Sequence, residues 1–262
     1  MRKWPLLLVL ILLAASIGHG ALAAPLDSIP IAPLVPFEEA TPVTPDASST
    51  QAAPLSTDLP LLVNNDNPLP DGYKPVELVK LFDHKRSFKL ADSDIYVEAH
   101  VFQAMNEMFA AARKDGVTGF IVTSGYRTEK DQIRLYKNDT EGVAAKPGHS
   151  EHQTGLAFDV SGGGNENFAK TDLFKWLRYN CWDYGFIIRY PKGKEQITGI
   201  PFEPWHYRYV GTAHSKVIGD LGGYVTLEEY IAKGGAQGFT EELAAIEAAG
   251  GWEAVEKAKN GG

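Results

Sequence analysis

The distribution of proline is the feature that most constrains how this chain can fold. Ten of the sixteen prolines in the 262-residue chain lie in residues 25–70, and this stretch also carries six acidic residues but no lysine or arginine. Each proline fixes the backbone φ angle and removes an N–H donor, so the stretch is unsuited to a helix or to the centre of a sheet. We therefore interpret 25–70 as an extended acidic linker and expect the folded part to begin near Asp71.

The first 24 residues have the pattern of an export signal. Arg2 and Lys3 precede an apolar run over 6–17, and the small-x-small sequence at 21–23 resembles a cleavage site. The apolar run is shorter than the roughly 20 residues that cross a bilayer comfortably. We predict a signal peptide over 1–24, with an uncleaved anchor that tethers the chain to a membrane as the alternative. In either case the folded part works outside the cytoplasm.

Composition excludes several classes of protein. The 33 acidic and 25 basic side chains give a net charge of −8, whereas nucleic-acid binding requires clustered lysine and arginine. A hydrophobic content of 44% supplies one sizeable core and excludes general disorder. The single cysteine, Cys181, rules out an intrachain disulfide and is expected to be buried. We expect one folded domain over 71–231, acting as a monomer, and a Gly/Ala/Glu-rich tail over 232–262 with two short helical stretches.

Hydrophobic periodicity predicts an α+β fold. Apolar residues recur at helical spacing over 93–114, and two further helices are expected at 128–138 and 172–183. Short β-branched or aromatic runs predict strands at 119–124, 155–160, 185–190 and 205–210. Because helices and strands alternate irregularly, we expect a small antiparallel sheet flanked by helices.

Two short segments carry the chemistry. In the strand at 155–160, period-2 alternation turns Phe158 and Val160 toward the core and places Asp159 with Ala157 on the opposite face. A charged residue beside a small one suggests a site with room for a ligand. His152 lies seven residues before Asp159, across a glycine turn.

The second segment contains Glu203 and His206, which are three residues apart. Two histidines and one carboxylate form a catalytic zinc set with the fourth position open to water, and a second carboxylate can take the proton of that water. Glu203 must lie on a loop or bulge before the strand at 205–210, since a three-residue offset places two residues on opposite faces of a regular strand. A lone histidine or glutamate is more often structural, so spacing alone leaves both interpretations open.

Together the motifs resemble a known family. Ser-x-His-x-x-Gly-x-Ala-x-Asp at 150–159, Glu-x-x-His at 203–206 and Ser-Gly-Tyr-Arg at 124–127 are similar to the D-alanyl-D-alanine carboxypeptidases of the vancomycin-resistance type. These are zinc peptidases of bacterial cell-wall metabolism, related in fold to lysostaphin-type endopeptidases and to the hedgehog signalling domain. The resemblance covers roughly 71–231 and implies a zinc site on the face of the sheet.

The resemblance also implies a role for each matching residue. It makes His152, Asp159 and His206 the zinc ligands. Glu203 becomes the general base that deprotonates the attacking water and passes the proton to the leaving amine, and Arg127 neutralises charge on the scissile carbonyl oxygen. The residues implied to contact the substrate are Ser150 and Gln132, which bind its terminal carboxylate, and Tyr126 and Trp205, which line the pocket.

The function expected from these residues is removal of the C-terminal D-alanine from peptidoglycan stem peptides. An L,D-carboxypeptidase acting on tetrapeptide stems uses the same motifs and is the principal alternative. A wall endopeptidase would need a groove open at both ends, and a non-catalytic wall-binding module would be expected to lack a ligand or the base. Here all of these residues are present.

Overall fold

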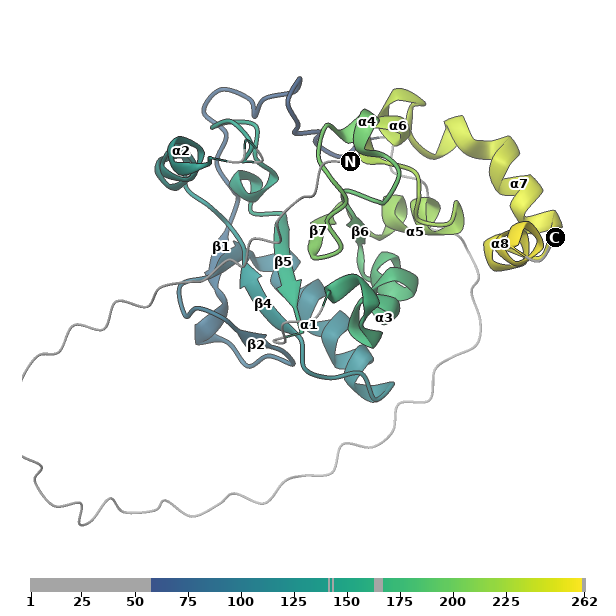
Figure 1. Cartoon of the computed structure of the whole chain (residues 1–262), viewed down its shortest axis with the longest axis horizontal. Helices are drawn as coiled ribbons and strands as arrows, with labels where there is room; N and C mark the ends of the chain where they lie inside the picture. Colours follow the sequence, from purple (N-terminus) through teal and green to yellow (C-terminus); the bar gives the residue numbers. More distant parts are fainter. Residues whose placement is uncertain (1–57, 141, 143, 163–166, 261–262) are drawn as a thin grey trace, which may run out of the picture. The chain divides into compact units, whose positions relative to one another are not determined.

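The computed structural model describes residues 58–140, 142, 144–162 and 167–260 (Figure 1). These belong to one compact unit of the chain, Gln51–Gly262. The predicted signal segment, 1–24, and the part of the predicted linker over 25–57 lie outside the described residues.

A five-stranded sheet forms the centre of this unit. Its strand order is β2-β4-β5-β7-β6, from β2 (Lys89–Leu90), β4 (Ile121–Ser124), β5 (Ala157–Ser161), β7 (His206–Tyr209) and β6 (Phe186–Ile188). The predicted α+β class is confirmed, and the four strands predicted from the sequence all pair antiparallel. The sheet as a whole is mixed, because the edge strand β2 pairs parallel to β4. A two-residue strand has no periodicity to recognise, so the sequence does not predict it.

The pairing of β5 with β7 sets out the functional face. Asp159 lies directly opposite His206, and Ala157 lies opposite Arg208. Directly paired residues project from the same face of a sheet, so these four side chains share one face. Phe158 and its partner Tyr207 point to the other face, where their rings stack.

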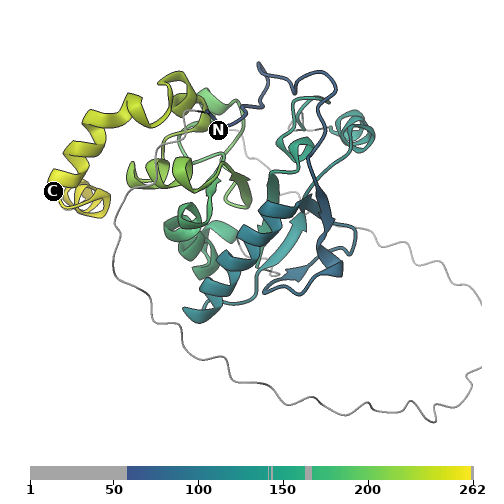
Figure 2. The ribbon, with the colours of Figure 1, turned by 180° about the vertical axis from the view of Figure 1, so that it is seen from behind.

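Helices cover that other face (Figure 2). Helix α1 (Ala99–Lys114) buries Met105, Met108 and Phe109 in one hydrophobic cluster with Phe158 and Val160 of β5. Helix α3 (Asp172–Asn180) and the 3₁₀ helix η4 (Cys181–Tyr184) add Leu177 and the fully buried Cys181 to the same cluster. The sheet therefore has one apolar, covered face and one face that carries polar side chains.

Helix α1 starts later than its sequence pattern predicts. Residues Tyr96–Glu98 form strand β3, which pairs antiparallel with β1 (Leu78–Lys80) in a separate two-stranded sheet. The helical apolar spacing begins at Val101, whereas the preceding Tyr96 and Val97 are residue types that favour strands.

A second hydrophobic cluster involves the C-terminal helices. Helix α5 (Thr212–Asp220) contributes Ile218, α6 (Leu227–Ala232) contributes Leu227 and Tyr230, and the 3₁₀ helix η5 (Gly235–Phe239) contributes Phe239. The two helical stretches expected in the tail are α7 (Thr240–Ala248) and α8 (Trp252–Asn260).

The remaining short elements are α2 (Glu129–Asn138), α4 (Glu195–Thr198), η1 (Leu81–Asp83), η2 (Glu151–Thr154) and η3 (Phe168–Lys170). Among the described residues, no helix has both the length and the apolar character needed to cross a membrane.

Residues 58–70 pack on the folded unit, although the sequence analysis places them in the linker. Val63 is fully buried, and the Leu69 N–H donates to the Gly148 carbonyl. The carbonyl oxygens of Leu61 and Val63 accept hydrogen bonds from the guanidinium groups of Arg208 and Arg189. Proline removes backbone donors but leaves every carbonyl, so an extended proline-rich segment can still be held by arginine side chains. We call residues 58–70 the N-terminal strap.

Candidate metal centre and active site

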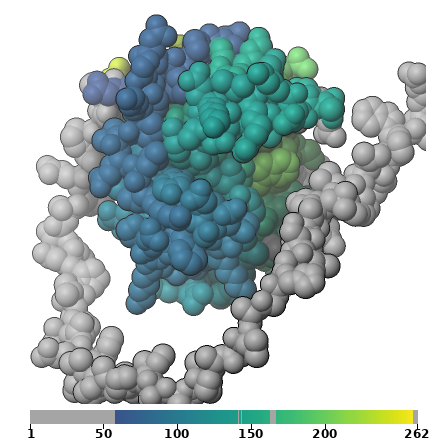
Figure 3. Space-filling model, turned by 90° about the vertical axis from the view of Figure 1, so that its left-hand side faces the viewer, coloured from purple at the N-terminus to yellow at the C-terminus, as the bar shows by residue number. Residues whose placement is uncertain are grey.

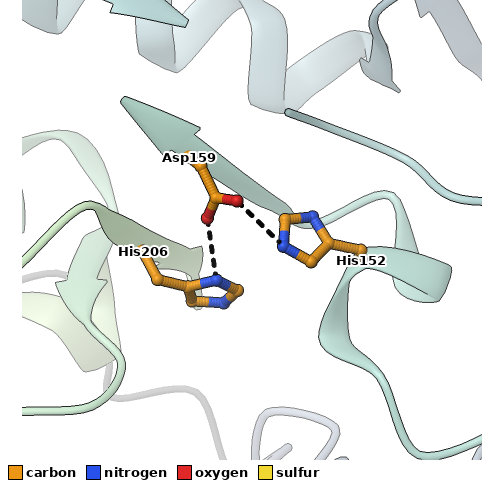
Figure 4. Close-up of side chains that lie close together, drawn as sticks. All are labelled: His152, Asp159 and His206. Atoms are coloured by element: carbon orange, nitrogen blue, oxygen red, sulfur yellow. Dashed lines mark hydrogen bonds and ion pairs between the residues drawn. The ribbon is translucent and has the colours of Figure 1, made fainter. Parts of the chain in front are cut away.

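The three predicted metal ligands lie together (Figure 4). Their ligand atoms all lie within 4.8 Å of one another. Asp159 is central: its Oδ1 is 3.0 Å from His206 Nδ1, and its Oδ2 is 3.4 Å from His152 Nε2. The site stands on the face of the sheet that the helices α1 and α3 leave uncovered, as expected from the alternation along β5.

Each ligand is placed by a different local device. The β5–β7 register brings Asp159 and His206 together directly. His152 lies on η2, which ends at Gly155 with φ +76°, a left-handed conformation that favours glycine. This turn leads the chain from His152 into β5 within a few residues.

The orientation of His152 depends on a close backbone approach at Gly125. The Nδ1 atom of His152 lies 2.8 Å from the Gly125 carbonyl oxygen, which leaves Nε2 facing Asp159. A Cβ atom at Gly125 would stand only 2.3 Å from the Tyr96 carbonyl oxygen, so only glycine fits there without movement. A backbone carbonyl bonded to the second nitrogen is the usual way in which proteins fix a metal-binding imidazole.

The donor set and its spacing fit zinc. Two ligand atoms at zinc–ligand distances of about 2.1 Å and a tetrahedral angle are roughly 3.4 Å apart. The separations of 3.0 and 3.4 Å between Asp159 and the two histidines are close to this value. Two histidines and one carboxylate leave one tetrahedral position for water or substrate.

Burial and charge shape the titration of these groups in the metal-free protein. Burial by itself would raise the pKa of Asp159, but His152 and His206 stabilise its charge and lower that pKa below its usual range. Burial would lower the pKa of His206, but its hydrogen bond to Asp159 and the nearby charges of Asp159 and Glu151 raise it to about 9. Protons and a metal ion therefore compete for His206 over the neutral pH range.

Glu203 lies in the loop that precedes β7, as its spacing from His206 requires. Its N–H donates to the Tyr190 carbonyl, and its Oε2 is 3.8 Å from His206 Nδ1, the nitrogen that faces the site. Burial raises the pKa of Glu203, His206 lowers it, and the nearby Asp159 raises it further. The net shift is upward, which is the direction that suits a proton acceptor working near neutral pH.

Arg127 lines the same site and lies on the turn between β4 and α2. Its N–H donates to the His152 carbonyl, and its guanidinium Nη1 donates to Gln132 Oε1 at 2.8 Å. The amide nitrogen of Gln132 donates to the Ala145 carbonyl at 2.6 Å. Gln132 is fully buried and contacts Arg127 through this hydrogen bond.

A small cavity of about 170 Å³ joins the remaining groups. Arg127, Ser150 and Trp205 line it together with the metal-site residues and Glu203. The lining residues, taken from the described part of the chain, do not include Tyr126 or Gln132. Figure 3 shows the teal part of the chain, which includes α2, on this face of the unit. The substrate contacts expected of Tyr126 and Gln132 stay predictions.

Sequence reasoning missed Tyr190, which lines the same cavity. Its ring lies 5.0 Å from the His206 ring, and its carbonyl holds the Glu203 N–H. Tyr190 is the last residue of the strand predicted at 185–190, and an aromatic residue in a strand is more often part of a core, so its sequence context gives no functional signal.

Sequence reasoning also missed the fully buried Glu151. Its Oε1 accepts hydrogen bonds from Arg189 Nε at 2.6 Å and from Arg208 Nη1 at 2.7 Å, and both arginines are fully buried. Burial would raise the pKa of Glu151, but the two arginines lower it below its usual range. A signal for this cluster exists in the sequence: Arg189 and Arg208 occur in otherwise apolar strand patterns, and a buried cation requires a partner. Arg208 is paired directly with Ala157 across the β5–β7 ladder.

The comparisons with known sequences agree on one family. A family model described as D-alanyl-D-alanine carboxypeptidase (VanY) matches residues 94–212. The D-alanyl-D-alanine carboxypeptidase of Enterococcus faecium is 38% identical over 174 residues, which cover 65% of this chain and 56% of that enzyme. The bifunctional D-Ala-D-Ala dipeptidase and carboxypeptidase VanXYC of Enterococcus gallinarum is 38% identical over 188 residues, which cover 64% of this chain and 91% of that enzyme. The aligned part thus spans little more than half of the E. faecium enzyme and most of the E. gallinarum enzyme.

Solved structures give the same grouping. The LdcB LD-carboxypeptidase aligns with a TM-score of 0.58 and 39% identity, covering 65% of this chain and 84% of that one. A mutant of the vancomycin-resistance D,D-pentapeptidase VanY from a VanB-type resistance cassette, solved in complex with Zn(II), aligns with a TM-score of 0.53 and 36% identity. That alignment covers 68% of this chain and 99% of the solved one.

Proposed function

The chain belongs to the VanY-type D-alanyl-D-alanine carboxypeptidase family, and on that premise we propose that it is a zinc carboxypeptidase that removes the C-terminal D-alanine from peptidoglycan stem peptides. The observation that carries the proposal is the joint position of two histidines, one aspartate and a nearby glutamate on one small cavity. Those are the groups that metal-assisted hydrolysis of a peptide bond requires.

His152 Nε2, Asp159 and His206 Nδ1 would hold the zinc ion. When bound, zinc supplies a Lewis acid that makes water more acidic and polarises the scissile carbonyl. The role of these three residues is to fix the ion's position and to leave one side open toward the cavity.

Glu203 acts as the general base. Its carboxylate lies 3.8 Å from His206 Nδ1, from where it would take a proton from the attacking water and return it to the leaving amine. Arg127 lines the same cavity, and its guanidinium stabilises the negative charge that develops on the carbonyl oxygen. Gln132 contributes by holding the Arg127 guanidinium in place.

We propose that polar groups in the lining of the same cavity recognise the C-terminal end of the substrate. The Ser150 hydroxyl lies in the cavity lining and is suited to donate a hydrogen bond to the terminal carboxylate. Trp205, which is 41% exposed, offers an apolar wall beside Glu203 for the part of the substrate before the cleaved bond. The proposed substrate and the export-like N-terminal segment support an activity outside the cytoplasm, and we propose that the protein acts as a monomer.

An L,D-carboxypeptidase acting on tetrapeptide stems is the second candidate, and the similarity to the LdcB LD-carboxypeptidase favours it. The two activities differ in the stereochemistry of the residue before the cleaved bond. Incubating the zinc-loaded protein with a stem pentapeptide and, separately, with a stem tetrapeptide distinguishes them by the mass of the products. Loss of one alanine from the pentapeptide supports the first candidate, whereas trimming of the tetrapeptide alone supports the second.

A pair of matched substrates tests the recognition of the chain end. Amidation of the terminal carboxylate removes the charge and places a donor where the site expects an acceptor, which leaves polar groups unpaired at roughly 1–3 kcal/mol each. We expect the free pentapeptide to be trimmed at least about tenfold faster than its C-terminal amide, because two groups left unpaired at about 1 kcal/mol each already exceed the roughly 1.4 kcal/mol that corresponds to tenfold. Ser150→Ala should narrow the difference. Equal rates on the two substrates would favour an endopeptidase.

A further inference from the structure

Two buried polar atoms face each other directly behind the metal site. Within the described residues, Glu151 Oε2 and His206 Nε2 each lack a hydrogen-bond partner that meets normal geometry. They lie 3.5 Å apart, and both side chains are at most 4% exposed. Buried polar atoms of this kind are costly unless they are paired, so their mutual orientation calls for a reason.

The metal site supplies that reason. When His206 Nδ1 binds a metal ion it carries no proton, so a neutral imidazole has its remaining proton on Nε2. Nε2 then becomes a buried donor, and the acceptor that faces it is Glu151 Oε2. A small shortening of the 3.5 Å separation completes a normal hydrogen bond.

Glu151 is itself held from several directions. Its Oε1 takes one hydrogen bond from Arg189 and one from Arg208, which leaves Oε2 directed at His206. Arg189 is held in turn by Glu228 of helix α6, at 2.6 and 2.9 Å. Arg208 is anchored on the Leu61 carbonyl of the N-terminal strap at 2.7 Å. The carboxylate therefore has little freedom to turn away from the histidine.

We propose that Glu151 is a positioning residue for the metal centre: through Oε2 it accepts the Nε2 proton of His206, and thereby fixes the orientation and tautomer in which His206 Nδ1 binds zinc. The proposal rests on the zinc site of the proposed function and is independent of which stem peptide is cleaved. Glu151 makes no contact with the substrate in this account and acts only through His206.

The test compares two glutamates of the same ion network. Glu151→Gln replaces the acceptor that faces His206, whereas Glu228→Gln alters the far end of the network, which does not touch His206. Zinc dissociation constants are measured by competition with a chromophoric chelator at fixed pH. Loss of a partner of a metal-bound histidine typically costs 10–100-fold in metal affinity, so we expect an increase of that size for Glu151→Gln and less than about threefold for Glu228→Gln.

Glu151→Gln also leaves a buried arginine without its counter-charge, which can prevent folding. The double variant Glu151→Gln/Arg208→Gln removes one charge of each sign and keeps the Arg189–Glu228 pair, and it is expected to show the same loss of zinc affinity. Circular dichroism of each metal-free variant establishes that it is folded. A folded Glu151→Gln or double variant with wild-type zinc affinity, or an equal loss in Glu228→Gln, would overturn the proposal. Absence of zinc binding by the wild-type protein in the same assay would instead refute the zinc site itself.

Discussion

At the scale of single residues, different side chains of the site are assigned to metal binding and to proton transfer. The ligand atoms of His152, Asp159 and His206 lie within 4.8 Å of one another. Glu203 lies next to them, with its Oε2 3.8 Å from His206 Nδ1. A ligand and a base at such short range can be distinguished only by substitutions that affect one role and leave the other intact.

Glu203→Gln is such a substitution, because it keeps the shape of the side chain and removes the proton acceptor. We expect zinc content close to that of the wild type and a fall in turnover of roughly 10²–10⁴-fold, the usual contribution of general acid–base catalysis. Elemental analysis and initial rates measure the two quantities on the same preparation. A wild-type rate would show that water activation does not depend on Glu203.

His206→Ala should have the opposite signature. It removes one of three ligands, so we expect most of the zinc to be lost from the purified protein, and activity with it. Full retention of zinc in this variant would contradict the ligand assignment.

The titration of His206 gives a pH dependence for zinc binding. In the metal-free protein its pKa is raised to about 9, so below that pH the ligand is protonated and zinc must displace a proton. The apparent zinc affinity should therefore rise by about tenfold per pH unit between roughly pH 6 and 8.5 and level off near pH 9. Chelator competition at several pH values, corrected for the chelator's own titration, measures this slope. A zinc affinity that does not change with pH would contradict it.

At the scale of elements, the N-terminal strap is the part of the fold that departs most from expectation. Val63 is fully buried although the strap lies in a stretch rich in proline and free of lysine and arginine. Val63→Ala should lower the free energy of unfolding by about 1.6 kcal/mol, at about 0.8 kcal/mol for each buried methylene-sized group. Val76→Ala is the matched control, since Val76 is 91% exposed and its loss should leave stability unchanged. Equal effects of the two substitutions in chemical denaturation would mean that the strap does not contribute to the folded unit.

The local sequence pattern was sufficient to predict the strands that carry Asp159 and His206. Alternation along β5 places Asp159 on the polar face, and the three-residue offset of Glu203 from His206 requires the loop that the structure contains. The strap, β2 and the Glu151 network depend on contacts between residues far apart in the chain, such as Arg208 with Leu61. Periodicity reports which face a residue occupies and not which distant segment covers it, so these features could not be predicted. Gln132 illustrates the same limit, because its position behind Arg127 follows from a contact with Ala145 across a loop.

At the scale of the whole molecule, a sheet with one apolar face and one polar face organises the unit. The helices α1 and α3 cover the apolar face, and the polar face presents the metal site with Glu203 and Arg127 in the lining of its cavity. The strap and helix α6 are joined to the back of this site through Arg208 and Arg189. Residues from distant parts of the folded unit therefore hold one small hydrolytic site in place.

The central claim is that this site makes the protein a zinc-dependent carboxypeptidase. The direct test is mass spectrometry of a purified stem pentapeptide after incubation with the zinc-loaded protein, with the chelator-stripped protein, and with the stripped protein to which zinc has been restored. The account predicts loss of a single C-terminal alanine in the first and third samples and an intact peptide in the second. Cleavage that survives removal of zinc, or cleavage at an internal bond, would contradict it.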